Sequence, residues 1–71
     1  GMNIAYTDDA DVDFARGMIP HHQAAVAMAQ TQLKYGKDPV LRKMSEDIIK
    51  AQNTEIKQLQ DWLRQYEHAQ H

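Results

Sequence analysis

The sequence predicts an all-α protein, an antiparallel hairpin of two long helices that pairs with a second copy to form a four-helix bundle. Three observations predict this fold. Apolar residues recur every three or four positions along two stretches, which is the period of a helix. A helix-stop signal followed by a helix-start signal separates the two stretches. The chain has 71 residues and no cysteine, so it is small for a stable core and has no disulfide to compensate.

The first helix is expected from about Asp9 to Tyr35. Thr7, Asp8, Asp9 and Asp11 offer several N-cap candidates and acidic charge for a first turn, which favours the positive end of the helix dipole. The expected inner stripe of this helix consists of Phe14, Met18, His21, His22, Ala25, Met28, Ala29 and Leu33.

The break between the helices lies near the middle of the chain. Gly36 suits the left-handed position just past a helix C-terminus, and Asp38-Pro39 suits an N-cap followed by a first helical residue. So short a turn makes the two helices antiparallel neighbours.

The second helix is expected from Pro39 to about Tyr66. Its apolar stripe consists of Leu41, Met44, Ile48, Ile49, Gln52, Glu55, Ile56, Leu59, Trp62 and Leu63, with two polar residues within it. The expected organisation is a flexible lead-in over residues 1–8, one helical-hairpin domain over 9–67, and a frayed tail over 68–71. Two helices cannot bury stripes of this width against each other alone, so a homodimer is expected.

Composition excludes several classes of function. Eight basic and ten acidic residues give a net charge of −2 with no basic cluster, so nucleic acid is not an expected partner. No apolar run approaches the ~20 residues of a membrane span, and no signal-peptide core is present. No catalytic triad, phosphate-binding glycine loop or paired acid–base carboxylates can be assembled. The chain is therefore predicted to be non-enzymatic and to use no organic cofactor.

One cluster offers metal-binding chemistry. Met18 lies one helical turn before His21 and His22, so a thioether and an imidazole are side by side. A thioether selects the soft ion copper(I) over harder metals. Counting outward from the turn at equal distances places His21 and His22 level with Asn53 and Gln52, and Met18 level with Glu55 and Ile56.

Two interpretations of this cluster are open. In the first, the polar residues form a structural network in which a histidine donates to Glu55 and Gln52 bridges the helices, fixing the register of a dimer. In the second, Met18 and one or both histidines bind a metal, with Glu55 as a ligand or as a partner of a ligand.

The segments Met18-Ile19-Pro20-His21-His22 and Gln52-x-x-Glu55-Ile56, at this separation, resemble the domain-of-unknown-function 305 family. The resemblance covers most of the chain, from about Asp11 to Tyr66. It implies a ferritin-like bundle of helical hairpins, in bacterial proteins that are often exported to the periplasm. It also implies copper sequestration or handover, since some members are linked to copper through Met and His. The residues to which it gives weight as metal ligands are Met18, His21, His22, Gln52 and Glu55.

Overall fold

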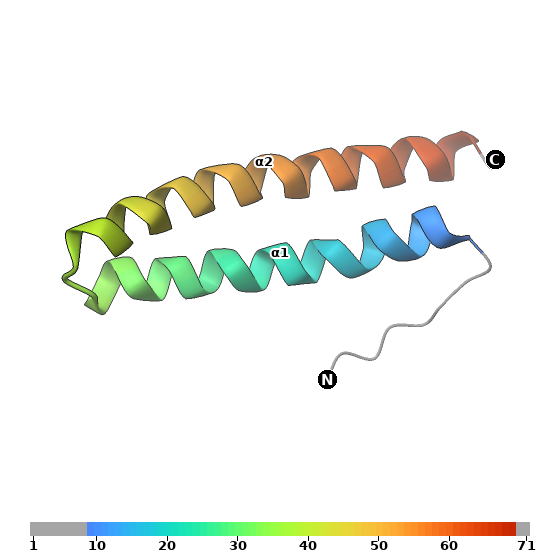
Figure 1. Cartoon of the computed structure of the whole chain (residues 1–71). Helices are drawn as coiled ribbons and strands as arrows, with labels where there is room; N and C mark the ends of the chain where they lie inside the picture. The colour runs from blue at the N-terminus through green and yellow to red at the C-terminus, as the bar shows by residue number, and fades with distance from the viewer. Residues whose placement is uncertain (1–8, 70–71) are drawn as a thin grey trace.

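The computed structural model describes residues 9–69 as two antiparallel helices, α1 (Ala10–Tyr35) and α2 (Pro39–Ala69), joined by a three-residue loop (Figure 1). The predicted all-α hairpin is confirmed. The boundaries of α1 and the start of α2 also agree with the prediction to within one residue. The expected lead-in over residues 1–8 lies outside the described residues.

The N-terminus of α1 is capped by Asp9. Its carboxylate accepts hydrogen bonds from the backbone N–H groups of Asp11 (3.0 Å) and Val12 (3.2 Å). These N–H groups have no carbonyl partner within the helix, so the cap satisfies two of the unpaired donors at this end. The Tyr66 hydroxyl of α2 donates to the same carboxylate, so the cap also joins the two helices at the end of the hairpin opposite the loop.

The loop differs from the prediction at Gly36. This residue has φ −80° and ψ 156°, which is extended backbone, so the predicted left-handed conformation is wrong. A different constraint favours glycine here. The Gly36 N–H donates to the Gln32 carbonyl at 2.6 Å, and a Cβ atom on Gly36 would lie 2.6 Å from that same oxygen.

The start of α2 follows the prediction. The Asp38 carboxylate accepts a hydrogen bond from the Leu41 N–H (2.9 Å), and Pro39 is the first helical residue. Arg42, one turn into α2, donates to the carbonyl of Leu33 (2.7 Å) and to that of Gly36 (3.1 Å). The guanidinium therefore pairs carbonyl groups at the C-terminus of α1 and fastens the loop.

The helix α2 is longer than predicted. It continues past the predicted end near Tyr66 to Ala69, while residues 70–71 lie outside the described part of the chain. Fraying of the tail over residues 68–71 stays a prediction. Side-chain pairs support this last stretch. Asp61 accepts from Lys57 and Arg64 on its own helix, and Arg16 of α1 lies 3.6 Å from Glu67.

The seam between the helices is narrow. Among the described residues, the buried side chains are those of Val12, Ala15, Ala29 and Ser45. The predicted inner stripe of the first helix is therefore wrong in part. Phe14 and Met28 belong to that stripe but are 62% and 75% exposed, whereas Val12 and Ala15 were not on it.

The two faces of the hairpin differ in chemistry. One face, here called the open face, carries exposed or half-buried apolar side chains, His21 and Glu55. Its residues are Phe14, Met18, His21, Ala25 and Met28 on α1, and Leu41, Met44, Ile48, Glu55 and Trp62 on α2. The opposite face is polar and exposed, with Arg16, Gln23 and Gln30 on α1, and Glu46, Asn53, Gln60 and Glu67 on α2. Neither described helix carries an apolar stretch long enough to span a bilayer.

Candidate functional site

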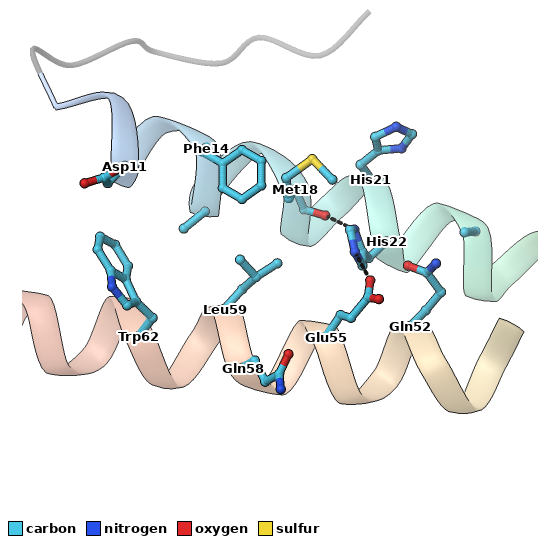
Figure 2. Close-up of a pocket in the computed structure, with 12 residues that line it drawn as sticks. Asp11, Phe14, Met18, His21, His22, Gln52, Glu55, Gln58, Leu59 and Trp62 are labelled. Atoms are coloured by element: carbon cyan, nitrogen blue, oxygen red, sulfur yellow. Dashed lines mark hydrogen bonds and ion pairs between the residues drawn. The ribbon is translucent and has the colours of Figure 1, made fainter.

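The open face is hollowed into a groove between the two helices, in the half of the hairpin farther from the loop (Figure 2). The groove has a volume of about 980 Å³. Phe14, Leu59 and Trp62 line its outer end together with the carboxylate of Asp11, and the end nearer the middle of the hairpin is lined by polar side chains, among them His22, Gln52 and Glu55 (Figure 2). An apolar groove with a few converging polar groups is the usual form of a binding site.

His22 and Glu55 join the two helices at the inner end of this groove. His22 Nε2 lies 2.5 Å from Glu55 Oε2, and His22 Nδ1 lies 2.9 Å from the Met18 carbonyl oxygen (Figure 2). Both ring nitrogens thus face acceptors. An imidazole that carries both N–H protons donates to both at once and forms an ion pair with Glu55. The predicted donation from a histidine to Glu55 is confirmed.

The environment of this pair is asymmetric. The His22 side chain is 12% exposed, whereas that of Glu55 is 50% exposed. The imidazole therefore belongs to the seam, and the carboxylate extends from the seam to solvent at the groove. Backbone and carboxylate together orient the ring, because each ring nitrogen has its own acceptor.

Met18 and His21 are disposed differently. Met18 is half-buried, and its side chain lies beside Phe14 on the groove side of α1 (Figure 2). His21 is exposed, and its ring points away from α2. It makes no hydrogen bond or ion pair with any residue that the structure describes. These two residues thus present a thioether and an imidazole to the outside of the hairpin.

Gln52 lies one turn nearer the loop than Glu55, half-buried, and its side chain extends toward α1 (Figure 2). All five residues predicted as site residues therefore line one groove. Over residues 9–69, however, no three side chains drawn from histidine, cysteine, aspartate and glutamate converge closely enough to hold a metal ion. Metal binding by the five residues stays a prediction.

Two further polar contacts across the seam were missed from the sequence. Ser45 is 6% exposed, and its hydroxyl donates to the Gln32 side-chain carbonyl at 2.9 Å. Tyr66 donates to Asp9, as described above. This contact lowers the pKa of the Asp9 carboxyl, together with the Val12 N–H, and raises the pKa of the Tyr66 hydroxyl. Only the heptad spacing of Ser45, Gln52 and Tyr66 along α2 signalled a common face for these residues.

Comparison with known proteins gives the family but no activity. The chain is 36% identical over 55 residues to an uncharacterized protein of Acanthamoeba polyphaga mimivirus, an alignment that covers 78% of this chain and 35% of the viral protein. The chain thus matches about a third of the length of that curated relative. Residues 2–69 match the sequence pattern of the family described as Domain of unknown function (DUF305). This chain, with the polar pair that joins its helices and the groove beside that pair, therefore belongs to the DUF305 family.

Proposed function

We propose that this chain is a self-associating helical module, in which a second copy covers the open face and completes a four-helix bundle. The observation that carries this proposal is the contrast between the two faces of the hairpin. The polar face is solvated, whereas the open face exposes large apolar side chains in register along both helices. A helix hairpin with one apolar face buries that face against another layer of helices.

The amount of exposed apolar surface supports this proposal. The large exposed side chains of the open face are Phe14, Met28, Leu41, Met44 and Trp62, with exposed fractions between 39% and 75%. At roughly 200 Å² for a large side chain, their exposed parts sum to on the order of 500 Å². That is as large as the largest apolar patch on a typical monomer, and it approaches the ~800 Å² per partner of a standard interface.

The polar layer has a role in this assembly. His22 and Glu55 lie at the edge of the open face, among apolar side chains. Sliding a second hairpin by one turn would press apolar side chains against the Glu55 carboxylate, which is 50% exposed, and remove its water. A polar layer among apolar ones specifies register in this way, at some loss of stability. In this proposal the layer aligns the two copies.

Sedimentation tests the proposal. The wild-type chain should sediment as a dimer of the 8.2 kDa chain. Met28→Lys places a charge on the open face without disturbing the seam, because Met28 is 75% exposed, and it should shift the equilibrium to monomer. Gln30→Lys is the matched control on the polar face and should leave the dimer intact. A wild-type chain that stays monomeric at millimolar concentration contradicts the proposal.

A second candidate function is copper(I) sequestration or handover. The observation that favours it is the disposition of Met18 and His21, which offer a soft sulfur and an imidazole on the same face of α1. Titration of copper(I) against a competing chelator tests it. Met18→Leu and His21→Ala should each weaken binding, whereas Met28→Leu and His68→Ala, which remove the same donor types elsewhere, should not. Equal affinity in all five proteins contradicts this function.

A further inference from the structure

We infer that the second copy is related to the first by a two-fold axis parallel to the helices, so that α1 of each copy packs on α2 of the other. In this arrangement the Glu55 carboxylate of one copy enters the groove of the other and accepts a hydrogen bond from the partner's His21. This inference rests on the proposed self-association. It goes further, because it determines which helices meet and which side chain of each copy the groove receives.

Symmetry leaves two simple arrangements for the dimer. Two copies of one chain associate most often about a two-fold axis. For each open face to cover the other, this axis must lie between the two faces and parallel to both. It then runs along the helices, which sets α1 on the partner's α2, or across them, which sets α1 on the partner's α1. The residues that line the groove distinguish the two.

The α1 side of the groove consists of holes of the kind that a packed helix fills. A side chain of one helix fits between four residues of its neighbour, spaced i, i+3, i+4 and i+7. Two such sets of groove-lining residues follow each other on α1. The first runs from Asp11 to Met18, and the second consists of Met18, His21, His22 and Ala25.

Contacts within the hairpin indicate which side chain of α2 reaches which hole. His22 contacts Glu55 and Gln32 contacts Ser45, and the two residue numbers add to the same total in both contacts. A two-fold axis along the helices leaves every residue at its own level, and α1 is antiparallel to the partner's α2 just as it is to its own. The same pairing of levels therefore holds across the interface. It centres Glu55 of one copy on the second hole, between His21 and His22 of the other.

The charges at this hole are complementary. Glu55 is 50% exposed, and its Oε2 lies 2.5 Å from His22 of its own chain, so the carboxylate still has capacity for further donors. His21 borders the hole and is exposed, with its ring on the outside of the hairpin (Figure 2). Its imidazole N–H is not used by any residue that the structure describes. Each Glu55 would thus accept from its own His22 and from the partner's His21.

The apolar levels match at the same time. By the same pairing of levels, Trp62 of one copy falls into the first hole of the other, beside Phe14, where the Asp11 carboxylate can accept from the indole N–H. One heptad to the other side, Ile48 falls beside Met28. The charged residue of α2 on the open face therefore meets an imidazole, while its neighbours one heptad away meet apolar side chains.

An axis across the helices places the charges badly. It sets α2 antiparallel on the partner's α2. In the registers nearest to full overlap, the hole that receives Glu55 begins at Ile48 and ends at Glu55, or begins at Glu55 and ends at Trp62. Both holes include the partner's Glu55, so two carboxylates meet. Like charges that face each other disfavour association, and the axis along the helices avoids this contact.

Charge substitutions at His21 test the arrangement by sedimentation of the full chain. His21→Lys keeps a donor opposite the partner's Glu55 and should retain the dimer. His21→Glu sets a second carboxylate there and should raise the dissociation constant of the dimer by about tenfold or more. Gln23→Lys and Gln23→Glu are the matched controls on the polar face, and neither should change the dissociation constant.

Cross-linking gives a second measurement, which does not depend on charge. The chain has no cysteine, so introduced thiols report on a single contact. Ala25 and Ala51 come level with each other across the proposed interface, and Ala→Cys adds only a sulfur atom at either position. Chains carrying Ala25→Cys and chains carrying Ala51→Cys, mixed under reducing conditions and then oxidised, should form disulfide-linked pairs. Neither variant should do so alone.

The outcomes separate this inference from the proposed self-association. Equal weakening of the dimer by His21→Lys and His21→Glu overturns the arrangement and leaves self-association standing. Disulfide-linked pairs of Ala25→Cys chains alone do the same, because they place α1 on the partner's α1. A wild-type chain that stays monomeric overturns both.

Discussion

His22 contacts Glu55 across the seam, although residues at equal distances from the loop place His22 level with Gln52. The direction of helical side chains explains this offset of three residues. Cα–Cβ bonds tilt toward the N-terminus of their helix. On α1 this tilt carries the His22 ring away from the loop, and on α2 it carries the Glu55 carboxylate toward the loop. The two groups therefore meet between the levels of their backbones. Ser45 and Gln32 are offset in the same sense.

The pair of adjacent histidines gives the first prediction. His22→Ala should lower the free energy of unfolding by about 1–3 kcal/mol, because it removes a ring that is mostly buried together with the hydrogen bond of that ring to the Glu55 carboxylate. His21→Ala should change the free energy of unfolding by less than about 0.5 kcal/mol, because His21 is exposed. Urea denaturation without metal and at one protein concentration measures both. Equal losses in the two variants would show that the His22–Glu55 pair is not structural.

The contact between Tyr66 and Asp9 gives a prediction about pH. The Asp9 pKa lies below its usual value of 3.8, chiefly because Tyr66 donates to the carboxylate. The hydrogen bond therefore contributes its full stabilisation above pH 3.8, and this stabilisation is lost as the pH falls through the lowered pKa. The Tyr66 pKa lies above 10.0 because of the same bond, so the contribution is present below pH 10 and is lost as pH rises through the raised pKa.

Tyr66→Phe should therefore melt at a lower temperature than wild type at intermediate pH, and the difference should shrink toward both extremes. Circular dichroism melts over a pH series measure it. Tyr35→Phe is the matched control, since the Tyr35 ring is 71% exposed, and its melting difference should not vary in this way. A pH-independent difference for Tyr66→Phe would argue against the hydrogen bond.

Gly36 gives a prediction about the loop. Gly36→Ala should cost about 1–3 kcal/mol, because the added Cβ would lie 2.6 Å from the Gln32 carbonyl oxygen and the backbone must move. Backbone conformation contributes little to this cost, since φ at Gly36 is −80°. The penalty should persist in a Gln32→Ala background, which removes the flexible side chain but keeps the carbonyl. Chemical denaturation measures it, and a penalty that vanishes in that background would assign the clash to the side chain.

Arg42 gives a prediction about the C-terminus of α1. Arg42→Met should lower the free energy of unfolding by about 1–3 kcal/mol, because it leaves the carbonyls of Leu33 and Gly36 without their donor. Arg42→Lys should recover only part of this loss, since an ammonium group lacks the planar fork of a guanidinium. Lys43→Met is the control. It breaks an exposed ion pair with Asp47 and should lower the free energy of unfolding far less than Arg42→Met does. A loss at Lys43 as large as that at Arg42 would contradict this role.

Much of this architecture follows from local signals in the chain. Helical periodicity, the Asp9 cap and the Asp38-Pro39 start specify two helices and a tight loop, because each depends on neighbouring residues only. A loop of three residues leaves little freedom except an antiparallel hairpin. That constraint brings Met18, His22 and Glu55 to one groove, as predicted.

The distribution of the apolar residues between two surfaces depends on how the helices pack. Val12 and Phe14 both fit a helical apolar pattern, yet Val12 lies in the seam and Phe14 on the open face. Local periodicity cannot distinguish two adjacent stripes, because both recur every three or four residues. The rotation of each helix about its own axis separates them, and that rotation is a property of the packed pair. The same rotation places His22 in the seam and its neighbour His21 on the outside.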